Sequence, residues 1–209
     1  MTDKSTSWAY AEGLADEDRA VVRARERSLE LGVSPVTPGV GAVLTVLAAT
    51  SKAQAVVEVG TGAGVSGVCL LRGLPAACTF TTIDTDIEHL KAARQAYSEA
   101  GILASRVRTI PGRAGAVLPR LNDAAYDLVF IDADKPSTPA YADEAVRLLR
   151  PGGLLVINDA LDRDRVANPA HRELATVRLR DLHRRLREDE RLSTALLPTG
   201  DGLFLASRR

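Results

Sequence analysis

Short apolar runs alternate with segments of helical periodicity through the middle of the chain. Five runs predict β-strands at residues 55–59, 79–83, 107–110, 128–131 and 154–157. The segments between them predict helices at about residues 65–72, 87–100, 114–120 and 141–149. Alternation of this kind is typical of a parallel sheet whose crossover helices cover both faces.

The two ends of the chain add further elements. Charged residues interspersed with Leu14, Val21, Val22 and Leu29 predict one exposed amphipathic helix over about residues 8–31. A second helix is expected from Thr37-Pro38 to about Thr50, because Thr is a good cap and Pro suits the first helical position.

The C-terminal part predicts an Arg-rich helix at about 169–190 and two strands, at 193–197 and 203–206. A turn at residues 198–202 would make these strands antiparallel at one edge of the sheet. The expected fold is therefore a doubly wound, mostly parallel, seven-stranded α/β sheet. We expect one domain over residues 1–209, with a helical extension (1–35) before a core (36–209).

Composition and charge narrow the function classes. The 209 residues are 45% hydrophobic and carry 27 basic and 27 acidic side chains, so a nucleic-acid or anionic-membrane partner has no electrostatic basis. The first residues lack the pattern of an export signal, and no apolar stretch is long enough to span a membrane, so we expect a cytoplasmic protein. Cys69 and Cys78 are expected to be reduced thiols in the core.

Acidic or amide side chains stand at the ends of four predicted strands. They are Glu58, Asp84, Asp132 and the pair Asn158-Asp159. Ligands of open parallel sheets bind beyond the carboxyl ends of the strands, so these groups are expected to converge on one crevice. Any one of them could instead cap the helix that follows, but four such groups at one sheet edge favour a site.

The first strand leads into a glycine-rich turn at residues 58–67. Residues 62–67 also match the dinucleotide pattern, and Asp84 follows Gly64 at the spacing of a ribose-binding carboxylate. However, Glu58 places a negative charge where a pyrophosphate would lie. The turn therefore favours a cationic, nucleotide-sized ligand.

At Glu58, Gly60, Gly62 and Gly64 the sequence resembles class I S-adenosylmethionine (SAM)-dependent methyltransferases. Four further segments make it similar to the small cation-dependent O-methyltransferases, the group of the caffeoyl-CoA and catechol enzymes. These segments are 36–38 (VTP), 130–135 (FIDADK), 151–153 (PGG) and 198–202 (PTGDG), and the match covers about residues 30–209.

The resemblance implies a Rossmann-like fold and a set of site residues. SAM contacts would fall on Val36, Glu58, Gly60, Thr61, Ser66, Asp84, Thr85, Ala114 and Asp132. A divalent metal, Mg²⁺ first with Mn²⁺ or Ca²⁺ as alternatives, would be bound by Asp132, Asn158 and Asp159. Lys135 would be the general base and, with Asp132, would form the catalytic pair.

The sequence departs from the family pattern after the fifth strand. The family's Asp-Asn metal ligands appear in reversed order as Asn158-Asp159, which puts the geometry of the metal site in question. The aromatic residue that the family often carries after this pair is replaced within residues 160–165 (ALDRDR). Arg163 and Arg165 could attract an anionic acceptor, although such arginines are more often surface residues.

The expected activity is transfer of a methyl group from SAM to a hydroxyl of a small phenolic or catechol-like acceptor. The alternatives are a non-catalytic SAM-binding module and, less favoured, an NAD-dependent oxidoreductase. By the resemblance, the appended helix carrying Trp8 and Tyr10 would pack against a second subunit, which predicts a homodimer.

Overall fold

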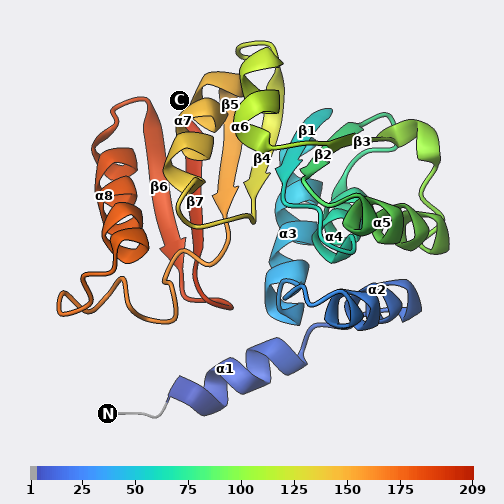
Figure 1. Ribbon diagram of the computed structural model, residues 1–209, viewed down its shortest axis with the longest axis horizontal. Helices are drawn as coiled ribbons and strands as arrows, with labels where there is room; N and C mark the ends of the chain where they lie inside the picture. The colour runs from blue at the N-terminus through green and yellow to red at the C-terminus, as the bar shows by residue number, and fades with distance from the viewer. Residues whose placement is uncertain (1–3) are drawn as a thin grey trace.

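The predicted apolar runs form the strands of a single sheet in the computed structural model, which describes residues 4–209 (Figure 1). The strands are β1 (Ala55–Val59), β2 (Thr79–Asp84), β3 (Val107–Pro111), β4 (Tyr126–Ile131), β5 (Leu149–Ile157), β6 (Leu192–Leu197) and β7 (Leu203–Arg208). Their order is β3-β2-β1-β4-β5-β7-β6, with β1 to β5 parallel and β7 antiparallel to both of its neighbours. The doubly wound, seven-stranded fold and the antiparallel pair at one edge are confirmed.

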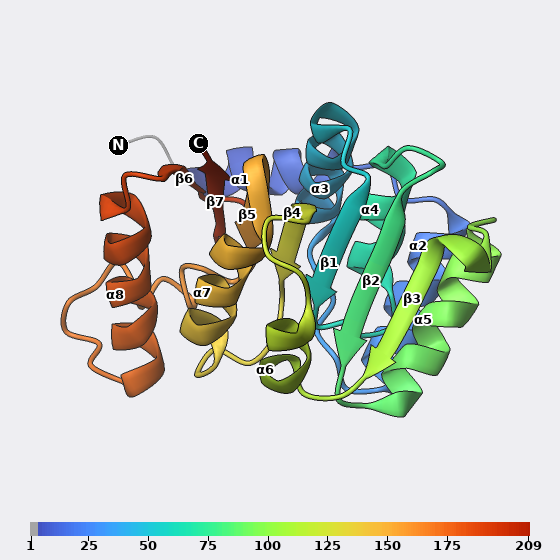
Figure 2. The same cartoon turned by 90° about the horizontal axis from the view of Figure 1, so that it is seen from above.

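Helices cover both faces of this sheet, as expected (Figure 2). They are α1 (Lys4–Gly13), α2 (Arg19–Glu30), α3 (Pro38–Ser51), α4 (Val65–Gly73), α5 (Ile87–Glu99), α6 (Ala114–Val117), α7 (Thr138–Leu148) and α8 (Leu174–Glu188). Two short 3₁₀ helices, η1 (Ala104–Arg106) and η2 (Leu118–Arg120), complete the elements of the described chain.

The sheet separates two hydrophobic clusters. Successive residues of a strand point to opposite faces, so Val56 packs with α2 to α5 while Val57 packs with α6 to α8. Both valines are fully buried. Burial on both faces of the sheet explains why the strand sequences are continuous apolar runs. Cys69 and Cys78 are buried free thiols within the first cluster, as the sequence predicted.

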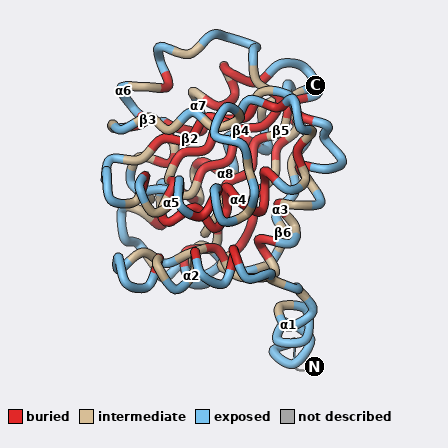
Figure 3. Tube along the Cα trace, turned by 90° about the vertical axis from the view of Figure 1, so that its right-hand side faces the viewer, coloured by how far each residue is buried: buried red, intermediate tan, exposed pale blue. Residues whose placement is uncertain are grey.

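The prediction of one N-terminal helix over residues 8–31 was wrong. The chain forms two helices, because Gly13 ends α1 and Asp18 caps α2 by accepting hydrogen bonds from the backbone N–H groups of Ala20 and Val21. None of the residues of α1 is buried, and this helix projects from the rest of the molecule (Figure 3).

Of the four apolar residues singled out in this region, only Val21 is buried. The α2 helix buries Ala20, Val21, Ala24 and Ser28, whereas Leu29 is 69% exposed. This buried face of α2 packs against α4 and α5.

Element boundaries differ most where Pro and Gly occur. Strand β5 begins at Leu149 rather than at residue 154, and a bulge separates the Tyr126–Leu149 pair from the Leu128–Leu154 pair. Helix α8 begins at Leu174, five residues later than expected, and α7 begins at Thr138, three residues earlier. Helix α3 begins as predicted, with Thr37 Oγ1 accepting from the Val40 N–H and Pro38 in the first turn.

The order of the strands reverses between β1 and β4, which are neighbours although β2 and β3 lie between them in sequence. This is a topological switch point, where the connections after β1 and β4 leave towards opposite faces and open a crevice. The acidic strand-end residues lie beside it.

Candidate functional site

Glu58, on β1, is the innermost acidic group of the site and is completely buried. Both of its carboxylate oxygens accept short hydrogen bonds, one from Ser66 Oγ at 2.6 Å and one from Thr82 Oγ1 at 2.6 Å. Thr82 Oγ1 also lies 2.6 Å from Thr61 Oγ1, so Thr82 links Glu58 to the turn after β1.

Burial has a large effect on this carboxylate. Desolvation raises the pKa of Glu58 to about 8, against the hydrogen bonds from Ser66 and Thr82, which lower it. The nearby charges of Asp132 and Asp84 raise the pKa further. A cationic ligand close to these three carboxylates would offset their mutual repulsion.

Asp84, at the end of β2, is oriented by the glycine-rich turn. Its Oδ2 accepts hydrogen bonds from the backbone N–H groups of Thr61 and Gly62, each at 3.0 Å. Its Oδ1 accepts from the Asp86 N–H at 2.9 Å and lies 3.2 Å from His89 Nδ1. The carboxylate is therefore fixed before any ligand arrives.

The turn after β1 needs glycine at two positions. Gly60 has a φ of +94°, and a Cβ there would lie 1.9 Å from the carbonyl oxygen of Asp132. Gly64 has a φ of +91° at the start of α4, and a Cβ there would press on Ala93 of α5. Both glycines let the turn lie flat against β4 and α5, which keeps the space above the strand ends open.

Two hollows flank this turn. The first is lined by Val36, Thr61 and Ser66 together with Gly60 and Asp132. The second, of about 260 Å³, is lined by Asp84, Thr85 and Ala114 on its far side and shares Gly60 and Asp132 with the first. Of the predicted SAM contacts, only Glu58 lines neither hollow, because it is completely buried behind Ser66, which lines the first hollow and donates to it.

A second cluster of polar side chains, Asp132, Asn158 and Asp159, lies at the ends of β4 and β5. Asn158 Nδ2 donates to Asp132 Oδ1 at 3.0 Å and to Asp159 Oδ1 at 3.2 Å. Burial raises the pKa of Asp132 to about 6, and Asp159 raises it further against the hydrogen bond from Asn158. Burial likewise raises the pKa of Asp159.

Asp132, Asn158 and Asp159 together offer oxygen atoms of the kind that bind a divalent cation. The Asn158 Oδ1 atom is buried without a hydrogen-bond partner, beside two carboxylates that repel each other. Rotation of the amide would turn that oxygen towards the two carboxylates, giving the oxygen donor set that Mg²⁺ prefers. Within residues 4–209 no three or more His, Cys, Asp or Glu side chains are grouped so that they could hold a metal ion.

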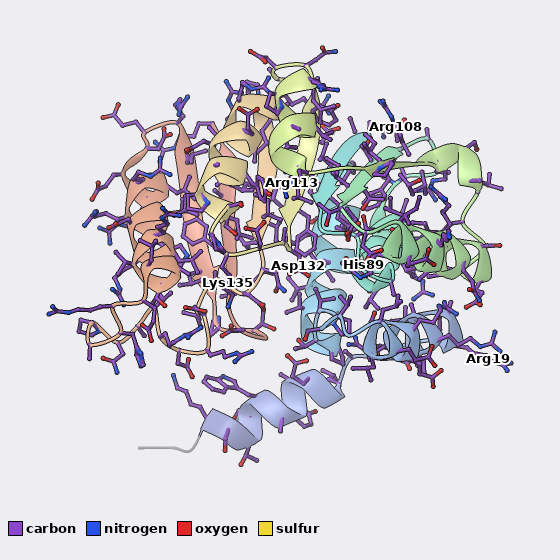
Figure 4. All side chains as sticks on the ribbon, in the orientation of Figure 1. Arg19, His89, Arg108, Arg113, Asp132 and Lys135 are labelled. Carbon is purple, nitrogen blue, oxygen red and sulfur yellow. The ribbon has the colours of Figure 1, made fainter. Side chains whose placement is uncertain are left out.

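Lys135 lies on the same rim, and Figure 4 shows Lys135, Asp132 and His89 in a row across the middle of the view. Its Nζ donates to Asp162 Oδ1 at 2.7 Å and lies 3.7 Å from Asp201 Oδ2. The Lys135 side chain is 26% exposed, so it borders both the solvent and this pair of carboxylates.

The structure thus brings together the strand-end residues that the sequence singled out, in two groups that meet at Asp132. It also adds residues that sequence reasoning missed: His89 beside Asp84, Thr82 behind Glu58, and Asp162 and Asp201 beside Lys135. His89 lies five residues after Asp84, in the first turn of α5, and this spacing was a usable signal. Thr82 gave no signal, because it is one of three threonines in β2.

Comparison with known proteins shows similarity over nearly the whole chain. An O-methyltransferase family model matches residues 12–209. A chain from Mycobacterium tuberculosis with the name "probable O-methyltransferase" is 52% identical over 96% of this chain and 90% of its own length.

Two solved structures share the fold. One, from Corynebacterium glutamicum, is 35% identical with a TM-score of 0.89, over 96% of this chain and 94% of that one. The other is the O-methyltransferase TomG of Streptomyces achromogenes, solved in complex with SAM, which is 28% identical with a TM-score of 0.88 over 99% of each chain. No helix within residues 4–209 is both long and apolar enough to cross a membrane. The chain belongs to the O-methyltransferase family of class I SAM-dependent enzymes.

Proposed function

We propose that this O-methyltransferase methylates a hydroxyl group of a small phenolic or catechol-like acceptor with the help of a divalent cation. The observation that carries the proposal is the meeting of Glu58, Asp84, Asp132 and Asn158-Asp159 at the switch point between β1 and β4. A positively charged donor and a cation both favour such a concentration of carboxylates.

The two hollows suggest how SAM would lie. Asp84 would accept hydrogen bonds from both ribose hydroxyls, since an ionised carboxylate offers only acceptors, and Thr85 and Ala114 would border the adenosine. Val36, Gly60, Thr61 and Ser66 would surround the methionine part in the first hollow. Glu58 would act on this part through Ser66 and through its charge.

Asp132, Asn158 and Asp159 would hold the cation, with Mg²⁺ first and Mn²⁺ or Ca²⁺ as alternatives. When bound, the cation would lower the pKa of the acceptor hydroxyl and orient a neighbouring oxygen of the acceptor. The reversed order of the pair is compatible with this arrangement, because the Asn158 amide donates to both Asp132 and Asp159 and so holds the three side chains together.

Lys135 would receive the proton of the acceptor hydroxyl at its Nζ atom. As the oxygen–methyl bond forms, the bond between the methyl group and sulfur breaks, and the sulfonium charge is lost. The new ammonium on Lys135 would be stabilised by Asp162, 2.7 Å away. A general base of this kind contributes about 10²- to 10⁴-fold to a rate.

The decisive experiment is turnover on a panel of catechols, with and without Mg²⁺ or Mn²⁺, for the wild type, Asp132→Ala and Lys135→Ala. We expect loss of most activity in both variants, and wild-type activity in Lys91→Ala, whose lysine pairs with Glu88 on the surface. Unchanged turnover in Asp132→Ala and Lys135→Ala would refute the assigned roles.

The cation is tested separately by metal titration. Asn158→Ala and Asp159→Ala should each weaken Mg²⁺ or Mn²⁺ binding by about tenfold or more. Equal affinity in the wild type and both variants would remove these residues from the metal site.

The exposed α1 helix supports a homodimer. Trp8 is 51% exposed and Tyr10 is 73% exposed, although large aromatic side chains are usually covered. Analytical ultracentrifugation should give a dimer for the wild type and a shift towards monomer for a Trp8→Ala, Tyr10→Ala variant. The buried free thiols are compatible with the reducing cytoplasm that we expect as its location.

A further inference from the structure

Asp162 stands out among the residues that connect β5 to α8. Of residues 161–173, it alone is buried, and its exposed fraction is 0%. A buried carboxylate is costly unless it is paired and hydrogen-bonded, so its position requires a reason.

Three side chains from three parts of the chain donate to this carboxylate. Oδ1 accepts from Lys135 Nζ at 2.7 Å and from Arg165 Nη2 at 2.7 Å. Oδ2 accepts from Thr176 Oγ1 at 2.5 Å, and Thr176 is itself fully buried in the first turn of α8. Burial raises the pKa of Asp162, but these three hydrogen bonds outweigh it and bring the pKa to about 2.

The backbone around Asp162 adopts an unfavourable conformation. Asp162, Arg163 and Asp164 have φ values of 52°, 55° and 60°, a left-handed run without a glycine. Such conformations are unfavourable for residues other than glycine and persist only when the surroundings enforce them. The ion pairs of Asp162 and the two hydrogen bonds from Arg163 N–H to the Asp201 carboxylate supply that enforcement.

We infer that Asp162 is a positioning residue for Lys135, holding the Nζ atom at the rim of the acceptor site and tying it to α8. This inference rests on the proposed role of Lys135 in methyl transfer. Asp162 itself is fully buried, so it holds the partly exposed Lys135 from the inner side of the rim.

The test is the chemical reactivity of the Lys135 amine without substrates, measured by acetylation with an N-hydroxysuccinimide ester and mass spectrometry. In Asp162→Asn we expect the acetylation rate of Lys135 to rise several-fold, because the amine loses its anionic partner. Lys52 and Lys91 in the same digest should keep their rates. Asp164→Asn is the matched control, since Asp164 has the same left-handed backbone but is exposed.

Steady-state kinetics give the second measurement. Asp162→Asn should lower kcat about tenfold or more, with the KM for SAM within about twofold of the wild type. Asp164→Asn should leave both parameters unchanged. Should Asp162→Asn fail to fold, Thr176→Val, which removes one donor to Asp162, is expected to raise Lys135 reactivity to a smaller extent.

The two possible failures are distinguishable. If Lys135→Ala retains wild-type turnover, the proposed role of Lys135 fails, whatever Asp162 does. If Lys135→Ala loses turnover but Asp162→Asn and Thr176→Val leave Lys135 reactivity and kcat unchanged, the positioning role of Asp162 is overturned.

Discussion

The pKa of a buried carboxylate in this site depends on which hydrogen-bond donors surround it. Glu58 and Asp162 are both completely buried carboxylates, yet burial raises the pKa of Glu58 to about 8, whereas the pKa of Asp162 is about 2. The difference lies in the donors, because Glu58 receives two neutral hydroxyl groups and Asp162 receives two cations as well as a hydroxyl. Charged donors stabilise a carboxylate far more than neutral ones do.

The raised pKa of Glu58 predicts a pH dependence of stability in the absence of SAM. The folded state binds this proton more tightly than the unfolded state, so the contribution of Glu58 is fully present below its ordinary pKa of 4.5 and is lost as the pH rises through about 8. Each pKa unit represents about 1.4 kcal/mol. In Glu58→Gln this part of the pH dependence should disappear.

Urea unfolding of the wild type and Glu58→Gln between pH 5 and pH 8 measures the effect. Glu30→Gln, a change at an exposed position in α2, should behave as the wild type. The same slope of unfolding free energy against pH in all three proteins would contradict the prediction.

At the scale of elements, α1 differs from every other helix of eight or more residues in the described chain, because it buries no residue. The side chain of Glu12 links it to the start of α3. Glu12 accepts a hydrogen bond from Thr37 Oγ1 at 2.9 Å and one from the Gly39 N–H at 2.7 Å, at the start of α3. A carboxylate at a helix N-terminus is favoured by the helix dipole.

Glu12→Ala should therefore release α1 from α3. We expect backbone amide exchange in residues 4–13 to accelerate several-fold, while stability falls by only about 1 kcal/mol because Thr37 still caps α3. Hydrogen exchange with mass spectrometry and thermal unfolding measure the two effects. Unchanged exchange in α1, compared with Glu30→Ala as the control, would show that Glu12 is not the attachment.

At the scale of the whole molecule, the site depends on four strands separated by long stretches of sequence. The switch point joins β1 to β4, and the residues that would surround SAM come from the segment before α3 and from the connections after β1, β2, β3 and β4. A ligand bound there contacts much of the fold, so its binding free energy should appear as global stability.

SAM should raise the Tm of the whole protein. At 100 times its dissociation constant a ligand adds about 2.7 kcal/mol, which for a chain of this size corresponds to about 5–11 °C. NAD should give no shift, and in Asp84→Ala the shift with SAM should be largely lost. Differential scanning fluorimetry provides the measurement, and stabilisation by NAD in preference to SAM would contradict the assigned ligand class.

The sequence by itself determined the strands, their acidic ends and the family. Apolar runs such as 55–59 and 128–131 form strands because they are buried on both faces, and that pattern needs no long-range information. Parallel topology then brings strand ends to one edge, so the meeting of Glu58, Asp84 and Asp132 was predictable.

Tertiary structure alone decided what surrounds these groups. The face that α2 buries follows from its packing on α4 and α5, whereas the break between α1 and α2 rests on local signals, Gly13 and the cap at Asp18. Thr82 covers Glu58, and Asp162 reaches Lys135, across 24 and 27 residues of sequence. Such pairings depend on where the folded chain places side chains, because local propensity and periodicity carry no information about partners so far apart.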